Sequence, residues 1–266
     1  MINKIVHTDA VTGMRALADA SIDLTVTSPP YDAIRDYGGH PFDIEPIADE
    51  LWRVTRPGGV VCWHVQDQIL ADGSESCTTD HQTLYFRQLD FLLYQRLYIV
   101  AMSYRRSTRR YYRQTSIVLV LSKGRPDTVR LLGDRPNSTA GRLSGGGLTF
   151  RGRDGSLSRR PPTIVPTHGI RGDCWVYDVG GRKTTSDSYA FAQGALMAEG
   201  LARDLILSYS QVGDLVLDPM AGAATTAKMA LLSHRRFLGF EPWDKAYRIA
   251  CRRMEDAHVT LMDMID

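Results

Sequence analysis

The sequence predicts an α/β fold around a mostly parallel sheet. Seven short runs rich in β-branched and aromatic residues are bounded by turn residues, which is typical of strands. Apolar residues spaced three to four positions apart lie between several of these runs and indicate helices that cover the sheet. Residues 125–187 break this alternation. We therefore expect one domain with an irregular insertion, which a chain of 266 residues can accommodate.

The expected elements alternate along the chain between strand and helix. The strands span 2–6, 22–27, 59–65, 97–103, 116–122, 214–217 and 236–240. A helix begins after Asp43, a favourable N-cap, and ends before Arg56-Pro57-Gly58-Gly59, because proline and glycine interrupt helices. A further helix is expected over 191–209, where apolar residues recur at helical spacing. Strands that alternate with helices predict parallel pairing.

Positive charge is concentrated in one part of the chain. The net charge is only +2, yet residues 96–187 hold 18 Lys and Arg against 6 Asp and Glu. Between Tyr104 and Arg113, arginines alternate with aromatic residues, a composition suited to phosphate neutralisation and base stacking. A solvated surface face is the alternative reading of this run. The residues expected to contact a polyanion are Arg105, Arg106, Arg109, Arg110 and Arg113.

Composition argues against several other classes of protein. No apolar stretch approaches the roughly 20 residues that a membrane-spanning helix needs, and no secretion signal is recognisable, so we expect a cytoplasmic protein. The four cysteines lie far apart without a Cys-x-x-Cys pair, which argues against a disulfide framework. Cys77 and His81 have no second pair nearby, so no metal site is predicted.

The first motif with chemical content is Thr27-Ser28-Pro29-Pro30-Tyr31, at the end of the strand 22–27. Ligands of open α/β sheets bind outside the carboxyl ends of strands. The two prolines fix the backbone and leave the Pro29 carbonyl without a neighbouring donor. This carbonyl and the Ser28 hydroxyl could accept both hydrogens of a planar exocyclic amine, which would favour a more tetrahedral, nucleophilic nitrogen. A rigid turn without chemistry is the alternative reading.

The second motif is Asp218-Pro219-Met220-Ala221-Gly222, between the strand 214–217 and a helical run. Small residues allow the backbone to approach a ligand closely, and the acid can accept from an amine or hydroxyl. The Gly-Lys-Thr of a phosphate-binding loop is absent. Glu241 ends the next strand, 23 positions after Asp218, a spacing suited to ribose hydroxyls.

Together the two motifs resemble those of the amino-group DNA methyltransferases that use S-adenosylmethionine, in the permuted order of the β group. The resemblance implies a circularly permuted class I methyltransferase fold with a seven-stranded doubly wound sheet. The strands 214–217 and 22–27 would be its adjacent first and fourth strands, so the motifs would meet. Residues 1–124 and 188–266 would form the catalytic domain, and 125–187 would be the target-recognition insertion.

The resemblance also implies roles for individual residues. Ser28 and Pro29 would bind the target amine, Tyr31 would stack on the flipped base, and Pro30 belongs to the same catalytic motif. The implied cofactor-binding residues are Asp9, Phe191, Asp218, Pro219, Met220, Ala221, Gly222, Thr225 and Glu241. Asp218 and Gly222 would border the methionine moiety, Glu241 the ribose and Asp9 the adenine. Ala224 replaces a usual glycine, and we expect it to resist a positive φ and to crowd the cofactor.

The reaction implied is direct methyl transfer from S-adenosylmethionine to the exocyclic amine of a base flipped out of double-stranded DNA. Ser-Pro-Pro-Tyr is mostly associated with cytosine N4, which we favour, and adenine N6 is the alternative. A DNA-binding protein with a decayed cofactor site is an alternative of a different class, and methylation of RNA or of a protein amide is another. A homodimer and a cognate restriction endonuclease as partners stay open.

Overall fold

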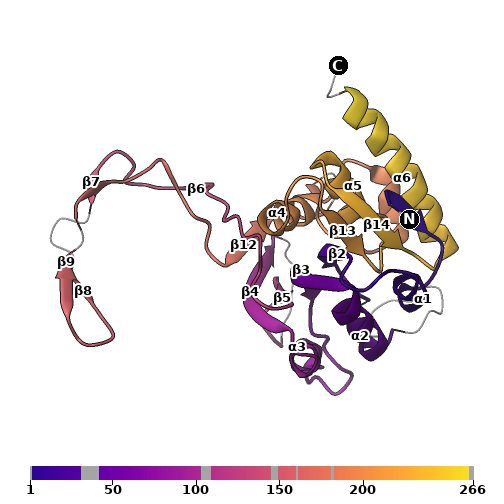
Figure 1. The fold of residues 1–266 in the computed structure, drawn as a ribbon, viewed down its shortest axis with the longest axis horizontal. Helices are drawn as coiled ribbons and strands as arrows, with labels where there is room; N and C mark the ends of the chain where they lie inside the picture. The colour runs from indigo at the N-terminus through magenta and orange to yellow at the C-terminus, as the bar shows by residue number, and fades with distance from the viewer. Residues whose placement is uncertain are drawn as a thin grey trace. The chain divides into compact units, whose positions relative to one another are not determined.

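The computed structural model describes residues 2–30, 42–102, 109–144, 149–159, 161–180 and 183–263. Eight strands form one sheet in the order β1-β14-β13-β2-β3-β5-β4-β12 (Figure 1). Their bounds are β1 Lys4–Val6, β2 Ile22–Thr27, β3 Thr55–Val65, β4 Leu92–Ala101, β5 Thr115–Ser122, β12 Cys174–Tyr177, β13 Leu215–Asp218 and β14 Arg236–Phe240. All neighbours pair in parallel except β5, which is antiparallel to both β3 and β4.

This strand order confirms the predicted α/β fold and its permutation. β13 and β2 are adjacent, with Val216 opposite Leu24 and Leu217 opposite Thr25. The seven expected strands all form, and β12 adds an eighth that the sequence analysis did not identify. β12 is a four-residue edge strand with only Trp175 buried, so its sequence lacks the apolar run that marked the other strands.

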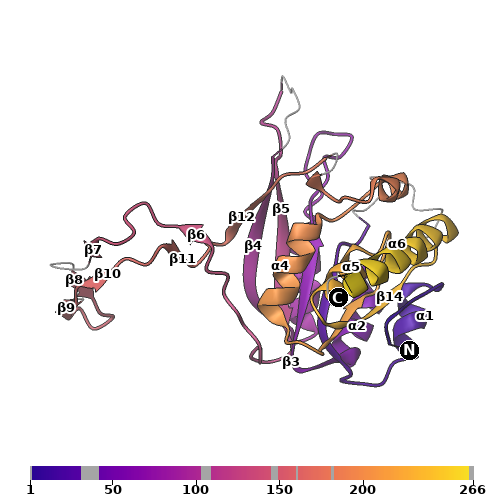
Figure 2. The same cartoon turned by 90° about the horizontal axis from the view of Figure 1, so that it is seen from above.

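Helices form two groups, one for each face of a doubly wound sheet (Figure 2). One group comprises α1 Ala10–Arg15, α2 Ile44–Val54 and α3 Thr78–Gln88, and the other α4 Glu199–Tyr209, α5 Thr225–Leu232 and α6 Asp244–Asp263. Asp43 caps α2 as expected, since its carboxylate accepts from the backbone N–H of Glu45 at 3.2 Å. The single helix expected over 191–209 is instead a 3-10 helix, η2 Ser188–Gln193, followed by α4.

Aromatic side chains fill the core between α2, α3 and the sheet. The Trp63 and Phe86 rings meet edge to face with centroids 5.2 Å apart, and Phe91 packs on Phe86 in the same way at 5.6 Å. The indole N–H of Trp63 donates to Gln82 at 2.7 Å, so the one polar atom of this ring is satisfied. This packing anchors β3 directly beside β2, whose end carries the first motif.

Residues 131–172 form a separate unit, which we call the arm. It contains three short antiparallel pairs: β6 Arg135–Pro136 with β11 His168–Gly169, β7 Leu143–Ser144 with β10 Thr163–Ile164, and β8 Thr149–Arg151 with β9 Leu157–Arg159 (Figure 1). None of its described residues is buried. The arm is narrower than the expected insertion 125–187, because β12 and the residues after it belong to the unit that contains the sheet.

No helix in the described part of the chain is both long and apolar enough to span a bilayer.

Candidate functional site

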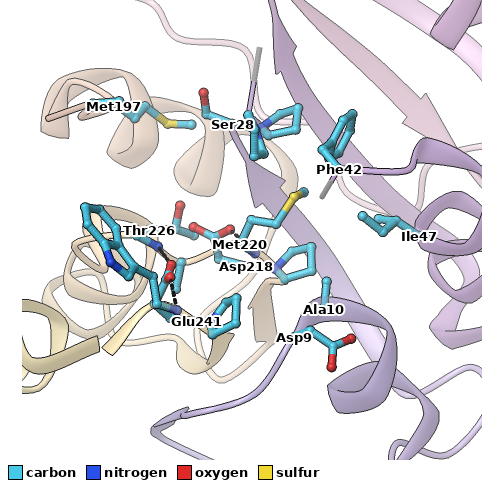
Figure 3. Close-up of a pocket in the computed structure, with 18 of the residues that line it drawn as sticks. Asp9, Ala10, Ser28, Phe42, Ile47, Met197, Asp218, Met220, Thr226 and Glu241 are labelled. Atoms are coloured by element: carbon cyan, nitrogen blue, oxygen red, sulfur yellow. Dashed lines mark hydrogen bonds between the residues drawn. The ribbon is translucent and has the colours of Figure 1, made fainter. Parts of the chain in front are cut away.

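A cavity of about 530 Å³ lies at the carboxyl ends of four neighbouring strands. Asp9 follows β1, Ser28 follows β2, Asp218 ends β13 and Glu241 follows β14. Figure 3 shows Asp218 and Met220 between Ser28 and Asp9. The residues that sequence analysis singled out and that line this cavity are Asp9, Ser28, Pro29, Pro30, Asp218, Pro219, Met220, Ala221, Gly222, Thr225 and Glu241. The two motifs therefore share one cavity.

Two hydrogen bonds join the motif after β2 to the motif after β13. The Thr27 hydroxyl donates to Asp218 Oδ1 at 2.7 Å, and the Thr226 hydroxyl donates to the carbonyl of Val26 at 3.0 Å. Thr27 and Thr226 are buried, so both bonds are shielded from water. They fix the Ser28 motif and the Asp218 motif relative to each other.

Asp218 is buried, with 5% of its surface exposed. Burial raises its pKa to about 6, although hydrogen bonds from Thr27 and from the Met220 backbone N–H, the latter at 3.2 Å, act in the opposite direction. The group therefore changes charge just below neutral pH. In its ionised form it can accept hydrogen bonds from a cationic group in the cavity.

Glu241 closes the turn that follows β13. It accepts from the backbone N–H of Gly222 at 2.7 Å and from that of Trp243 at 2.9 Å. Burial raises its pKa, and the two backbone hydrogen bonds act against that rise. Gly222 has φ +53°, and a Cβ there would lie 3.2 Å from the Gln193 side chain. A side chain at 222 would thus be both strained and crowded.

Asp9 is the exposed acid of the site. It caps α1, and its carboxylate accepts from the backbone N–H of Thr12 at 2.9 Å. Partial burial acts to raise its pKa, but hydrogen bonds to Thr12 and its neighbours outweigh this and lower it. Asp9 therefore offers a permanent negative charge at this end of the cavity.

Several cavity residues were not predicted from the sequence. Apolar and aromatic walls come from Phe42, Ile47, Met197 and Trp243, and their positions depend on tertiary packing. His64 also lines the cavity. Its Nε2 lies 2.7 Å from the Ser116 hydroxyl, and burial lowers the pKa of the ring to about 4, so it is neutral at physiological pH. The described residues hold no group of three or more His, Cys, Asp or Glu side chains suited to a metal ion.

Phe191 is one predicted cofactor residue that does not line the cavity. It lies in η2 and is 39% exposed, whereas Gln193, Ala195, Leu196 and Met197 line the cavity. The reason is that the chain forms a 3-10 helix here, followed by Gly194 at φ +94°. The family resemblance implied Phe191 as a cofactor contact, and the structure instead brings Gln193 and the residues after it to the cavity wall.

The predicted contacts outside the cavity are only partly described. Tyr31, Arg105 and Arg106 lie outside the described residues. Arg109 and Arg110 are exposed, and the guanidinium of Arg110 donates to the carbonyl of Gly73 at 2.5 Å. Arg113 pairs with Glu75 and bonds to the carbonyl of Asp67, so it stabilises the loop after β3.

Ala224 differs from its expected behaviour. It adopts φ +59° despite its Cβ, and it caps the N-terminus of α5. Its side chain is fully buried and is not among those that line the cavity. An alanine in this left-handed conformation costs roughly 1–2 kcal/mol.

This strain predicts unequal effects of glycine at two buried alanines. We expect Ala224→Gly to change the free energy of unfolding by less than about 0.5 kcal/mol. Glycine relieves the backbone strain, and this gain offsets two losses, the burial of one methyl group and the greater conformational entropy of the unfolded chain. Ala230→Gly, in the regular interior of α5, has no strain to relieve and should lower it by about 1–2 kcal/mol. Urea denaturation of the two variants measures this difference, and equal losses would contradict the strain at Ala224.

Comparisons with known proteins agree with this geometry. A family model described as DNA methylase, of the N6 and N4 type, matches residues 22–252. M.BamHII of Bacillus amyloliquefaciens, described as an orphan methyltransferase, is 39% identical over 247 residues, 90% of this chain and 91% of that protein. The PvuII DNA methyltransferase, described as cytosine-N4-specific, has a TM-score of 0.68 at 14% identity, covering 98% of this chain and 92% of that chain.

A second solved structure carries a ligand. TTHA0409 of Thermus thermophilus, in complex with S-adenosyl-L-methionine, has a TM-score of 0.63 at 20% identity, covering 95% of each chain. At these identities the two structures establish the fold, while the family match and M.BamHII establish the family. The chain belongs to the DNA methylases, S-adenosylmethionine-dependent enzymes that methylate an amino group of cytosine or adenine.

Proposed function

We propose that this protein transfers a methyl group from S-adenosylmethionine to the N4 amine of cytosine in double-stranded DNA. The observation that supports this most directly is the shared cavity, in which Ser28 and Pro29 meet the turn after Asp218. A catalytic strand end and a cofactor turn must adjoin for direct transfer, because the two reactants have to lie in line.

The chemistry of the cavity fits the cofactor. S-adenosylmethionine carries a sulfonium, an ammonium group, ribose hydroxyls and an adenine, and the cavity offers acids at three separate strand ends between apolar walls. In our proposal Asp218 accepts from the ammonium group, Glu241 from the ribose hydroxyls, and Asp9 from the adenine amine. The bound cofactor supplies an electrophilic methyl group, and no cysteine nucleophile is required.

Ser28 and Pro29 prepare the attacking nitrogen. An exocyclic amine is planar because its lone pair is delocalised into the ring. In our proposal the Ser28 hydroxyl and the Pro29 carbonyl each accept one of its hydrogens, so the lone pair becomes available for attack. The base must first leave the duplex at a cost of a few kcal/mol, which protein contacts to the DNA offset.

The first residue of the motif favours cytosine over adenine. Ser28, like the serine of Ser-Pro-Pro-Tyr motifs associated with cytosine N4, presents a hydroxyl where an aspartate is associated with adenine N6. Mass spectrometry of nucleosides tests this, after incubation of unmethylated DNA with the protein and S-adenosylmethionine. N4-methylcytosine supports the proposal, N6-methyladenine selects the other base, and absence of both contradicts methylation of DNA.

The arm and the exposed arginines after β4 would hold the DNA. The arm carries seven arginines and two aspartates. Its exposed apolar side chains include Leu143, Phe150, Leu157 and Ile164. A two-stranded ribbon without a core is only marginally stable in water, so a partner surface is expected to order it. M.BamHII is described as an orphan methyltransferase, and we likewise propose that this protein acts without a partner endonuclease and as a monomer.

The raised pKa of Asp218 predicts that cofactor affinity depends on pH. Above about 6 the carboxylate is ionised, and below it the protonated group no longer attracts the ammonium ion. We therefore expect the affinity for S-adenosylmethionine to fall up to about tenfold for each pH unit below 6. Calorimetric titrations between pH 5 and 7.5 measure this. The Asp218→Asn protein should bind the cofactor weakly at every pH, and its affinity should depend less on pH. If its affinity changes with pH as steeply as that of the wild-type protein, a group other than Asp218 causes the dependence.

A further inference from the structure

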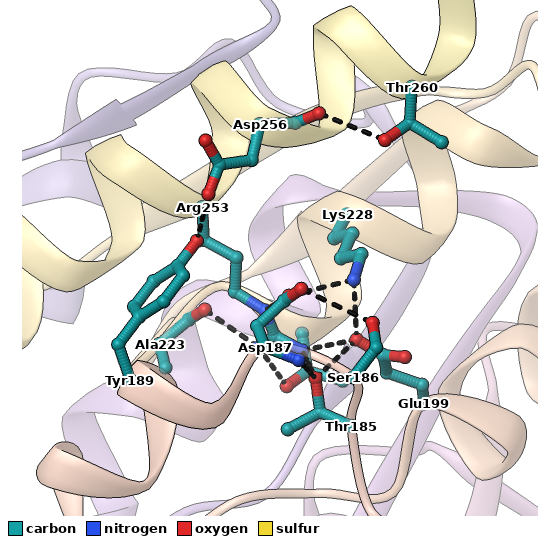
Figure 4. Close-up of polar contacts among 11 residues, drawn as sticks. Thr185, Ser186, Asp187, Tyr189, Glu199, Ala223, Lys228, Arg253, Asp256 and Thr260 are labelled. Carbon is teal, nitrogen blue, oxygen red and sulfur yellow. Dashed lines mark hydrogen bonds and ion pairs between the residues drawn. The ribbon is translucent and has the colours of Figure 1, made fainter. Parts of the chain in front are cut away.

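A cluster of four charged side chains, of which Arg253 and Lys228 are buried and Asp187 and Glu199 half-buried, lies beside residues 219–225, which we call the cofactor turn (Figure 4). Arg253 comes from α6, Lys228 from α5, Asp187 precedes η2 and Glu199 begins α4. Two positive and two negative charges balance within the cluster. None of the four side chains lines the cavity, so the function proposed above does not by itself require them.

Arg253 is the centre of this cluster. Its side chain is fully buried, and each of its five N–H groups has an acceptor. Two of these bonds reach the cofactor turn, at the Ala223 carbonyl (2.9 Å) and the Thr225 hydroxyl (2.8 Å). The other three reach Thr185, Asp187 and Glu199.

Lys228 completes the cluster and keeps both acids ionised. Its ammonium group lies 2.7 Å from Asp187 and 2.8 Å from Glu199. Burial acts to raise the pKa of each acid, but hydrogen bonds and ion pairs with Lys228 and Arg253 outweigh this and lower both values. The cluster is therefore a hydrogen-bonded network of paired acids and bases, in which loss of one partner leaves the others unsatisfied.

The two segments that Arg253 joins both form walls of the cavity. Gly222, Ala223 and Thr225 line it from the cofactor turn, and Gln193 and Met197 line it from the segment between Asp187 and Glu199. The gap between them is crowded, since a Cβ at Gly222 would contact Gln193. A small displacement of either wall would therefore change the space available to a ligand.

We propose that Arg253 is a positioning residue for S-adenosylmethionine. Its planar guanidinium holds the cofactor turn and the 185–199 segment at a fixed separation, and it supports Ala224 in its left-handed conformation through the residues on either side. A lysine keeps the charge but has three donors without the fork, so it cannot reach all five acceptors. This inference rests on the proposed role of the cavity as the cofactor site.

Arg253→Lys tests the proposal. We expect its equilibrium affinity for S-adenosylmethionine, measured by calorimetry well below the melting temperature, to fall about tenfold or more, since two hydrogen bonds to the turn are lost. The KM for the cofactor should rise by a similar factor, with kcat changed much less. Thr185→Val removes one acceptor of the guanidinium and the bonds of this hydroxyl to Glu199 and to the Asp187 backbone N–H, but it leaves both bonds from Arg253 to the cofactor turn, so it should weaken binding less.

Arg235→Lys is the matched control. Arg235 is also buried, but its guanidinium bonds to Ser210 and Ser233, which do not line the cavity. The Arg235→Lys substitution should lower the melting temperature and leave the affinity for S-adenosylmethionine unchanged. Wild-type affinity in folded Arg253→Lys, or equal weakening in Arg235→Lys, would overturn the inference. Failure of the wild-type protein itself to bind S-adenosylmethionine would instead overturn the proposed function.

Discussion

Replacement of Ser28 by alanine is expected to lower kcat for DNA methylation by roughly a hundredfold or more. The hydroxyl accepts one of the two amine hydrogens in our proposal, and loss of one such preorganised contact typically costs about 10²–10³ in rate. The affinity for S-adenosylmethionine should stay within about twofold, because the proposed cofactor contacts lie on other strand ends. Single-turnover methylation assays with radiolabelled cofactor, together with calorimetry, separate the two effects.

Ser21→Ala is the control for this experiment. The Ser21 hydroxyl donates to the carbonyl of Ala18 before β2 begins, at the opposite end of that strand from Ser28. The Ser21→Ala protein should methylate DNA at the wild-type rate. A Ser28→Ala protein that retains the wild-type kcat would exclude the hydroxyl as an amine acceptor and leave the Pro29 carbonyl as the remaining candidate.

The central part of the site was predictable because it depends on topology. Ser28 and Asp218 each follow an apolar run, and the permuted order that the family resemblance implies places those runs side by side, so their meeting required no knowledge of side-chain packing. Glu241 was found for the same reason, as the acid after the next strand. Local sequence and strand order together were sufficient for these three residues.

Residues whose role depends on tertiary packing could not be found in this way. The family resemblance implied Phe191, and the 3-10 helix with the turn at Gly194 brings Gln193 to the cavity instead. Arg253 lies in a long, strongly charged helix, where an arginine is ordinarily expected at the surface. Only the convergence of α5, α6 and the 185–199 segment shows that this particular arginine is buried.

The arm could be recognised as unusual but its limits could not be predicted. Its composition, rich in glycine, proline and arginine, indicated an irregular insertion. The strand β12 that follows it is short and half exposed, so nothing in the sequence separated it from the irregular residues. The limits 131 and 172 became visible only once β12 was found paired with β4.

Removal of the arm is expected to abolish most DNA methylation while leaving the cofactor site intact. The backbone N–H of Arg171 donates to the Leu132 carbonyl at 2.8 Å, so the two ends of the arm are adjacent and a short Gly-Ser linker can replace residues 131–172. Since no described residue of the arm is buried, its removal exposes no core. We expect affinity for S-adenosylmethionine to be unchanged and methylation of duplex DNA to fall more than about a hundredfold, through loss of phosphate and base contacts.

Substitutions of single charges test the electrostatic part of this prediction. The triple variant Arg151→Gln, Arg153→Gln, Arg159→Gln should reduce the slope of log K against log salt by up to about three, since each phosphate contact contributes roughly 0.9. Arg171→Gln is the matched control within the arm, because Arg171 pairs with Asp134 and has less charge to offer a phosphate. Fluorescence anisotropy of labelled duplex DNA between 50 and 200 mM salt, roughly the range over which such contacts weaken, measures both slopes. Equal slopes in the triple variant and the wild-type protein would mean that the arm does not contact phosphates, and the DNA would then have to be held by Arg109 and its neighbours.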